Sequence, residues 1–145
     1  TERLVVLGAS GPLDDSRPLV NGRAASPPPM EVRSGVAHRL RIVNISPLES
    51  HTVRLVAGDS LQQWRVVAKD GADLPAAQAI ARPATVWIHP GETYDVELLR
   101  QRPESLTLRV VATETAAARA AFVARARPGE AAPRIIIDVP VIVRN

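Results

Sequence analysis

Three histidines, His38, His51 and His89, are the only imidazoles that this chain offers for metal binding or acid–base chemistry. No two of them are separated by a single residue, so no strand can direct an H-x-H pair at one ion. The chain has no cysteine, which excludes disulfides, thiolate nucleophiles and thiolate metal ligands. We interpret His38 and His51 as polar residues at strand ends, and His89 as a flank of the Pro90-Gly91 turn. The sequence thus predicts no metal-binding, catalytic or cofactor-binding residue in this chain.

Three carboxylates, Asp70, Asp73 and Asp95, would need partners for hydrolytic chemistry that spacing alone cannot establish. Asp70 precedes Gly71 in a turn-forming sequence, and Asp95 falls on the polar face of an expected strand, so each has a structural role to fill. The sequence has no G-x-S-x-G element, phosphate-binding loop or dinucleotide-binding pattern. We therefore expect that the chain is not an enzyme by itself.

Arg39 and Arg41 alternate with apolar residues in one segment, and Asp95 and Glu97 do so in another. If the two strands are neighbours, guanidinium–carboxylate pairs between them would fix their register, contributing about 0.2 to 1 kcal/mol for each exposed pair. We predict that at least one such pair exists.

The distribution of charge argues against binding to nucleic acid. The net charge is +3, but the basic residues, of which Lys69 is the only lysine, are spread along the chain, and aromatic residues make up only 3%. A nucleic-acid surface usually gathers basic residues and adds stacking aromatics. No apolar run approaches the roughly 18 residues that cross a bilayer, so we expect no membrane span either.

Trp64 and Trp87 allow two interpretations. If exposed and coplanar, they would form the sugar-stacking platform of a free-standing adhesion or carbohydrate-binding sandwich of immunoglobulin or fibronectin type III kind. If buried, they would belong to the core or to an interface, which is the more common role of two aromatics at unrelated positions.

Alternating apolar and polar residues recur along the chain with turn residues between the runs, which is typical of an antiparallel β-sandwich or barrel. Asp70-Gly71 has the composition of a tight hairpin turn, because glycine accepts the positive φ that such turns need. Val43 and Ile45 lie on the face opposite Leu40, so their strand is expected to be central and covered on both sides. The pattern predicts about eight or nine strands, at residues 3–7, 30–33, 38–46, 51–57, 61–69, 84–89, 93–98, 106–110 and 134–144.

The stretch from Glu114 to Arg127 is rich in alanine and contains neither glycine nor proline, which favours a short helix or an irregular insertion. Pro128 and Pro133 end this stretch before the last strand. The sequence shows no repeat of fixed period and no low-complexity linker, so residues 1–145 are expected to form a single domain.

The segments that resemble a known family are PLVNG at 18–22, GVAHRLRIVNIS at 35–46, KDGADL at 69–74 and HPGETYDVEL at 89–98. In this order and at these spacings they resemble the second of the three cupredoxin-like domains of multicopper oxidases, the laccase-like enzymes. In that family the arginine-containing strand ends at an asparagine, here Asn44, and a DG turn and a YDV strand follow. The resemblance spans about Pro18 to Leu98 and fades beyond it.

The resemblance implies an all-β, Greek-key sandwich of cupredoxin-like fold that holds no copper of its own. In the family, the first and third domains supply the H-x-H pairs and the H-C-H segment that bind copper, and the middle domain packs between them. It therefore implies copper in the parent protein, flanking cupredoxin domains of the same chain as partners, and a periplasmic or secreted location. Val43, Trp87 and Phe122 are the candidates for packing against those neighbours.

The implied parent is an oxidoreductase that oxidises phenols, metal ions or similar donors and reduces dioxygen to water. The copper-free branch of the same family, which consists of exported cell-division scaffolds, is an alternative that this sequence does not separate from the oxidases. Because an intact oxidase would be far longer and flanking domains are lacking, we expect a fragment of a larger multidomain protein. The chain begins at Thr1 without an initiator methionine or a leader, so we expect any export signal to be removed or upstream.

Overall fold

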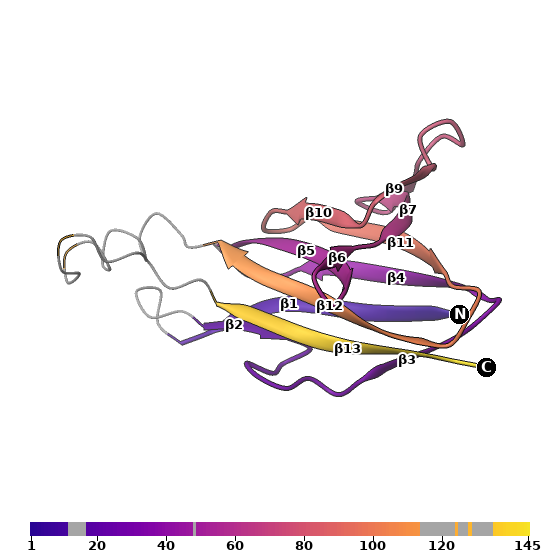
Figure 1. The fold of residues 1–145 in the computed structure, drawn as a ribbon. Coiled ribbons are helices and arrows are strands. Elements are labelled where there is room, and N and C mark those ends of the chain that lie inside the picture. The colour runs from indigo at the N-terminus through magenta and orange to yellow at the C-terminus, as the bar shows by residue number, and fades with distance from the viewer. Residues whose placement is uncertain (12–16, 48, 114–123, 125–127, 129–134) are drawn as a thin grey trace.

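The computed structural model describes residues 1–11, 17–47, 49–113, 124, 128 and 135–145. The secondary-structure elements of these residues are thirteen strands, arranged in two sheets that pack face to face (Figure 1). The predicted all-β sandwich is therefore confirmed. The strand number exceeds the expected eight or nine partly because three strands have only two or three residues, too few for an alternating pattern to reveal.

The seven-stranded sheet has β4 and β11 as its central strands. Its order is β2 (Arg17–Val20), β1 (Glu2–Ser10), β4 (Ala37–Asn44), β11 (Thr93–Leu99), β7 (Gln63–Lys69) and β8 (Ala72–Asp73), with β9 (Ala81–Pro83) also pairing with β7.

The six-stranded sheet is built around the two long strands β5 and β12. Its order is β10 (Thr85–Ile88), β5 (Ser50–Ala57), β12 (Glu104–Thr113), β13 (Ile136–Arg144) and β3 (Met30–Arg33), with β6 (Ser60–Leu61) also pairing with β5.

Two of the strand pairs are parallel, a feature that the alternating pattern did not indicate. β1 runs parallel to β4, and β13 runs parallel to β3, whereas the other pairs are antiparallel. An alternating apolar pattern is the same in both kinds of pairing, so it does not report strand direction. Between β1 and β4 the chain contributes β3 to the other sheet, and this crossing brings the two strands together in parallel.

The core lies between the two sheets and is filled by aliphatic side chains at alternate strand positions. On β4, Leu40 and Ile42 are fully buried, and on β7 Trp64 and Val66 are buried, as the alternation predicted. On β11 the pairing register with β7 shifts between Asp95 and the next residue. The largest fully buried apolar side chains are Leu7, Leu40, Ile42, Leu55, Ile88, Leu98 and Leu108.

The turn at Asp70-Gly71 joins β7 to β8 as a two-residue hairpin. Lys69 pairs with Ala72, and the two residues between them have φ values of 50° and 82°. Positive φ at both central positions is what a type I′ turn requires, and glycine adopts it without steric cost. The predicted hairpin is therefore confirmed.

The expected insertion at 114–127 falls outside the described residues, except for residue 124. Within the described ranges, none of the helical structure has the length and the apolar character that crossing a bilayer demands.

Replacing Gly71 by alanine should lower the free energy of unfolding by about 1 to 2 kcal/mol, because a Cβ in the left-handed region clashes with the following carbonyl. Gly8→Ala is the matched control, since its φ is not positive and the added Cβ would meet the Ile45 side chain at an ordinary 3.7 Å. Chemical denaturation of both variants measures the difference. Equal loss of stability in the two variants would contradict the turn assignment.

Candidate functional site

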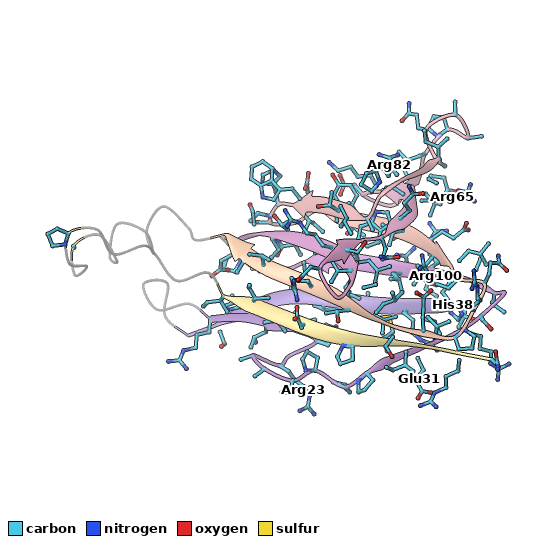
Figure 2. The ribbon with its side chains drawn as sticks, viewed as in Figure 1. Arg23, Glu31, His38, Arg65, Arg82 and Arg100 are labelled. Atoms are coloured by element: carbon cyan, nitrogen blue, oxygen red, sulfur yellow. The ribbon has the colours of Figure 1, made fainter. Side chains whose placement is uncertain are left out.

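His38 is the second residue of β4 and lies at the end of the sandwich where the N- and C-termini lie (Figures 1 and 2). Its ring is buried, and Nε2 accepts a hydrogen bond from the backbone N–H of Arg33 at 2.8 Å. Nε2 must be unprotonated to accept this bond. Burial lowers the pKa of His38, so the ring is held neutral and joins β4 to β3 across the end of the core.

His51 is the second residue of β5 and is fully buried between the sheets. Neither of its ring nitrogens has a hydrogen-bond partner among the described residues. Burial lowers the pKa of His51, because a charged ring would lose its hydration, and the nearby Glu49 opposes this shift only partly. The imidazole is therefore a neutral polar group within the core.

His89 follows β10 and is exposed. Its Nδ1 lies 3.0 Å from Oγ of Ser50, and its ring centroid lies 4.4 Å from that of Trp87 with the planes tilted by 52°. The three histidines thus occupy separate structural positions, two of them at the strand ends that the sequence indicated. In the part of the chain that the structure describes, no three His, Asp or Glu side chains gather as a metal site would require.

Asn44, the last residue of β4, organises the opposite end of the core. Its side chain is fully buried and donates to the backbone carbonyls of Glu49 at 2.8 Å and Ile88 at 3.1 Å. Its Oδ1 accepts hydrogen bonds from the backbone N–H and the hydroxyl of Ser46 at 3.0 and 2.7 Å. One amide thereby ties β4 of one sheet to the ends of β5 and β10 in the other.

The alternating pattern of β4 indicates a buried position for Asn44, although the family motif alone did not assign it a role. Asn44 follows Leu40 and Ile42 at the spacing of two that places all three side chains on the inward face. A polar residue at an inward position must find hydrogen-bond partners inside the protein. Which backbone groups provide them depends on loops that local patterning does not specify.

Asp95 on β11 lies between two arginines of the antiparallel neighbour β4. Arg41 is its direct cross-strand partner, and Arg39 lies two residues further along the same face. Arg39 donates through Nε at 2.7 Å, and Arg41 donates through Nε and Nη2 at 3.0 and 2.9 Å. The predicted guanidinium–carboxylate pairing between these strands is therefore confirmed.

The carboxylate of Asp95 is only 2% exposed, although the sequence placed it on an outward-facing polar surface. Its immediate neighbour Val96 is buried in the core, so the two residues face opposite sides of the sheet. Burial by itself raises the pKa of Asp95, but the hydrogen bonds from Arg41 and Arg39 outweigh burial and lower it. Asp95 is a structural anion in a cross-strand clamp.

The other carboxylates also have structural partners. Asp70 accepts a hydrogen bond from the backbone N–H of Thr93 at 2.8 Å, which links the hairpin turn to β11. Asp73 is exposed and lies 3.3 Å from Nη2 of Arg39. Glu97 pairs with Arg65 of β7 at 2.7 Å and not with β4.

The two tryptophans do not form a common platform. Trp64 is 2% exposed and belongs to the core, whereas Trp87 is 58% exposed on the edge strand β10. Of the positions suggested for packing against neighbours, Val43 is partly buried and Trp87 is exposed, and Phe122 lies outside the described residues.

Comparison with known proteins finds this fold in several solved structures. The sequence matches no family model and no curated protein. A blue copper oxidase from Nitrosomonas europaea matches 98% of the chain with a TM-score of 0.64 and 18% identity. A laccase-like multicopper oxidase from Ochrobactrum matches 99% with a TM-score of 0.62 and 19% identity. The chain has a cupredoxin-like fold.

A third similar structure, a copper-containing nitrite reductase from Thermus scotoductus, matches 99% of this cupredoxin-like chain with a TM-score of 0.60 and 14% identity. The chain spans 43%, 30% and 30% of the lengths of the three proteins. Because they include two oxidases and a reductase, the cupredoxin-like fold does not by itself determine a reaction.

Asp95→Asn should lower the free energy of unfolding by about 1 to 3 kcal/mol, since it removes the charge that two guanidinium groups share. Glu97→Gln is the control and should cost less than about 1 kcal/mol, because its partner Arg65 is half exposed. Urea denaturation at neutral pH compares the variants.

The same pair of variants tests the pH dependence. The lowered pKa of Asp95 gives stability that is present above its unfolded pKa of about 3.9 and is lost as the pH falls through the folded pKa. The difference between the wild-type protein and Asp95→Asn should therefore shrink in acid. A constant difference from pH 7 to pH 2 would show that the charge of Asp95 is not what stabilises the clamp.

His51→Leu should weaken the loss of stability on mild acidification. Because the folded pKa of His51 is lowered, the unfolded chain binds a proton that the folded chain does not, once the pH falls below about 6.5. The free energy of unfolding then decreases by up to about 1.4 kcal/mol per pH unit, and the variant lacks this contribution. Denaturation between pH 7.5 and 5 measures it, with the exposed His89→Gln as control. Identical pH profiles for the wild type and His51→Leu would contradict the assignment.

Proposed function

We propose that this chain is the copper-free structural middle domain of a multicopper oxidase, packing between the copper-bearing first and third domains. The proposal rests on two matched fractions: how much of this chain each copper oxidase matches, and how much of the oxidase this chain spans. Solved copper oxidases match 95 to 100% of this chain, while the chain spans only 26 to 44% of theirs. A complete cupredoxin-like unit of this kind would be one of several in its parent.

The chain's own polar groups support a structural role. Two of the groups that could bind a metal are engaged in the fold: Nε2 of His38 accepts a backbone hydrogen bond, and Asp95 pairs with Arg39 and Arg41. A cupredoxin copper centre uses a thiolate together with imidazoles, and the chain has no cysteine. In this proposal the parent's copper lies in the flanking domains, and residues 1–145 form one domain that positions them.

The proposed parent oxidises phenols, metal ions or similar donors and reduces dioxygen to water, in the periplasm or outside the cell. A copper-free scaffold of the same family would use the same domain in the same way, and the metal content of the parent separates the two. A free-standing sugar-binding module is the weaker candidate, because only Trp87 is exposed and Trp64 is part of the core.

Copper titration of the 145-residue chain tests the absence of a site in this domain. We expect no stoichiometric binding of Cu²⁺ by calorimetry and no intense blue absorption, since no thiolate is present to give it. His38→Ala and His89→Ala variants should show the same weak, nonspecific heats as the wild type. A one-to-one binding isotherm that either variant abolishes would overturn the proposal.

A further inference from the structure

The outer face of the seven-stranded sheet carries an apolar patch along β1 and β4, which we call the Ile45 patch: Leu4, Val6, Val43 and Ile45. Val6 lies directly opposite Val43 in the parallel register, and Ile45 continues the line beside Gly8. Leu4 is 55% exposed and Ile45 is 64% exposed. The sequence indicated that this strand is covered on both sides, yet no described part of the chain covers Ile45.

The outer face of the six-stranded sheet carries a second row, of three apolar residues and one threonine, which we call the Trp87 patch: Trp87, Thr52, Val111 and Ile136. These residues are direct cross-strand partners on β10, β5, β12 and β13. Trp87 and Ile136 are both more than half exposed. Large exposed aromatic residues are typical anchors of protein interfaces.

The charges around the two patches differ. Beside the Ile45 patch, Arg41 is neutralised by Asp95 and Glu2, so a partner could cover this face without leaving a charge unpaired. Beside the Trp87 patch, Arg54 lies opposite Arg109, whose carboxylate partner is Asp138. Arg54 itself has no ion-pair partner among the described residues. A partner that covers the Trp87 patch is therefore expected to bring a carboxylate.

Self-association explains these two surfaces poorly. A symmetric dimer places the same patch of both copies in contact and leaves the other patch exposed. If the Ile45 patch of one copy instead contacts the Trp87 patch of the next, the contact is head-to-tail and uses opposite faces. Such contacts produce open filaments unless the rotation between copies closes a ring. Two different partners, one on each outer face, would cover both patches at the same time.

We propose that the Ile45 patch and the Trp87 patch are the two docking surfaces for the flanking domains of the same polypeptide, one domain on each outer face of the sandwich. This inference rests on the proposed function and adds which surfaces are used. The domain on the Trp87 patch presents an acidic group to Arg54.

The position of the termini is compatible with this arrangement. Both ends of the chain lie at one end of the sandwich (Figure 1), while Ile45 and Ile136 lie toward the other end, beyond the end of β4 and at the start of β13. A nine-residue strand such as β13 spans about 30 Å, which is close to the diameter of a small domain. A domain attached at the terminal end and lying along a face therefore reaches the patch on that face.

Hydroxyl-radical footprinting of the full-length parent, read by mass spectrometry, tests the proposal. Ile80 is an internal control, because its exposed fraction in this domain is 59%, which matches Trp87 and Ile45. After each rate is normalised to that of the unfolded chain, Trp87 and Ile45 should be oxidised at least about fivefold more slowly than Ile80, as for residues at the centre of an interface. Weaker protection at either patch overturns the proposal.

The charge of Arg54 provides the second test. Arg54→Glu in the parent should restore oxidation of Trp87 and leave Ile45 protected, because like charges would then face each other across one interface only. Arg102→Glu is the control, since Arg102 is exposed just before β12, at the opposite end of that strand from Val111, and should leave both residues protected. Unchanged protection of Trp87 in Arg54→Glu overturns the acidic partner surface.

The copper content of the same parent sample separates this inference from the proposed function. A parent without copper contradicts the oxidase, whereas a copper-loaded parent in which both patches are oxidised as fast as Ile80 contradicts only the docking surfaces. Protection that appears only at high protein concentration, or only when an oligosaccharide is added, assigns the patches to a second copy or to a sugar and also overturns the inference.

Discussion

The pairing of β4 with β11 is the interaction on which the rest of this structure depends. One face of these two central strands supplies core residues, and the other face carries the ion pairs of Asp95 with Arg39 and Arg41. A single register therefore fixes both the core contacts and the ion pairs. A slip of one residue would place the two arginines inside the core and would carry Leu40 to the surface. The ion pairs are exposed on the arginine side and contribute modest energy, but they distinguish the correct register from its neighbours.

Two buried polar side chains of β4 also tie one sheet to the other. Asn44 and His38 lie at opposite ends of the β4 strand, and each forms hydrogen bonds with backbone groups of the other sheet or of the loops beside it. Such groups close the two ends of the sandwich and exclude water from the aliphatic core between them.

Much of the fold could be predicted from alternation and turn chemistry. The inward residues of β4 and β7, the hairpin at Asp70-Gly71 and the link between Arg39, Arg41 and Asp95 follow from patterns of two residues and from the φ requirement of glycine. The parallel partners of β1 and β13 could not be predicted, because alternation does not encode strand direction. The burial of Asp95 was missed for a related reason, since its cover comes from a strand more than fifty residues away.

By itself, the sequence determined that the chain is a β-sandwich without thiolate ligands, because residue types and local periodicity depend on covalent chemistry and on neighbours along the chain. Only the tertiary structure decided that Trp64 is buried while Trp87 is exposed, that His51 is isolated in the core, and that apolar residues gather on both outer faces. These properties depend on which strands are neighbours, and strand neighbours are set by the packing of the whole sandwich rather than by any local segment.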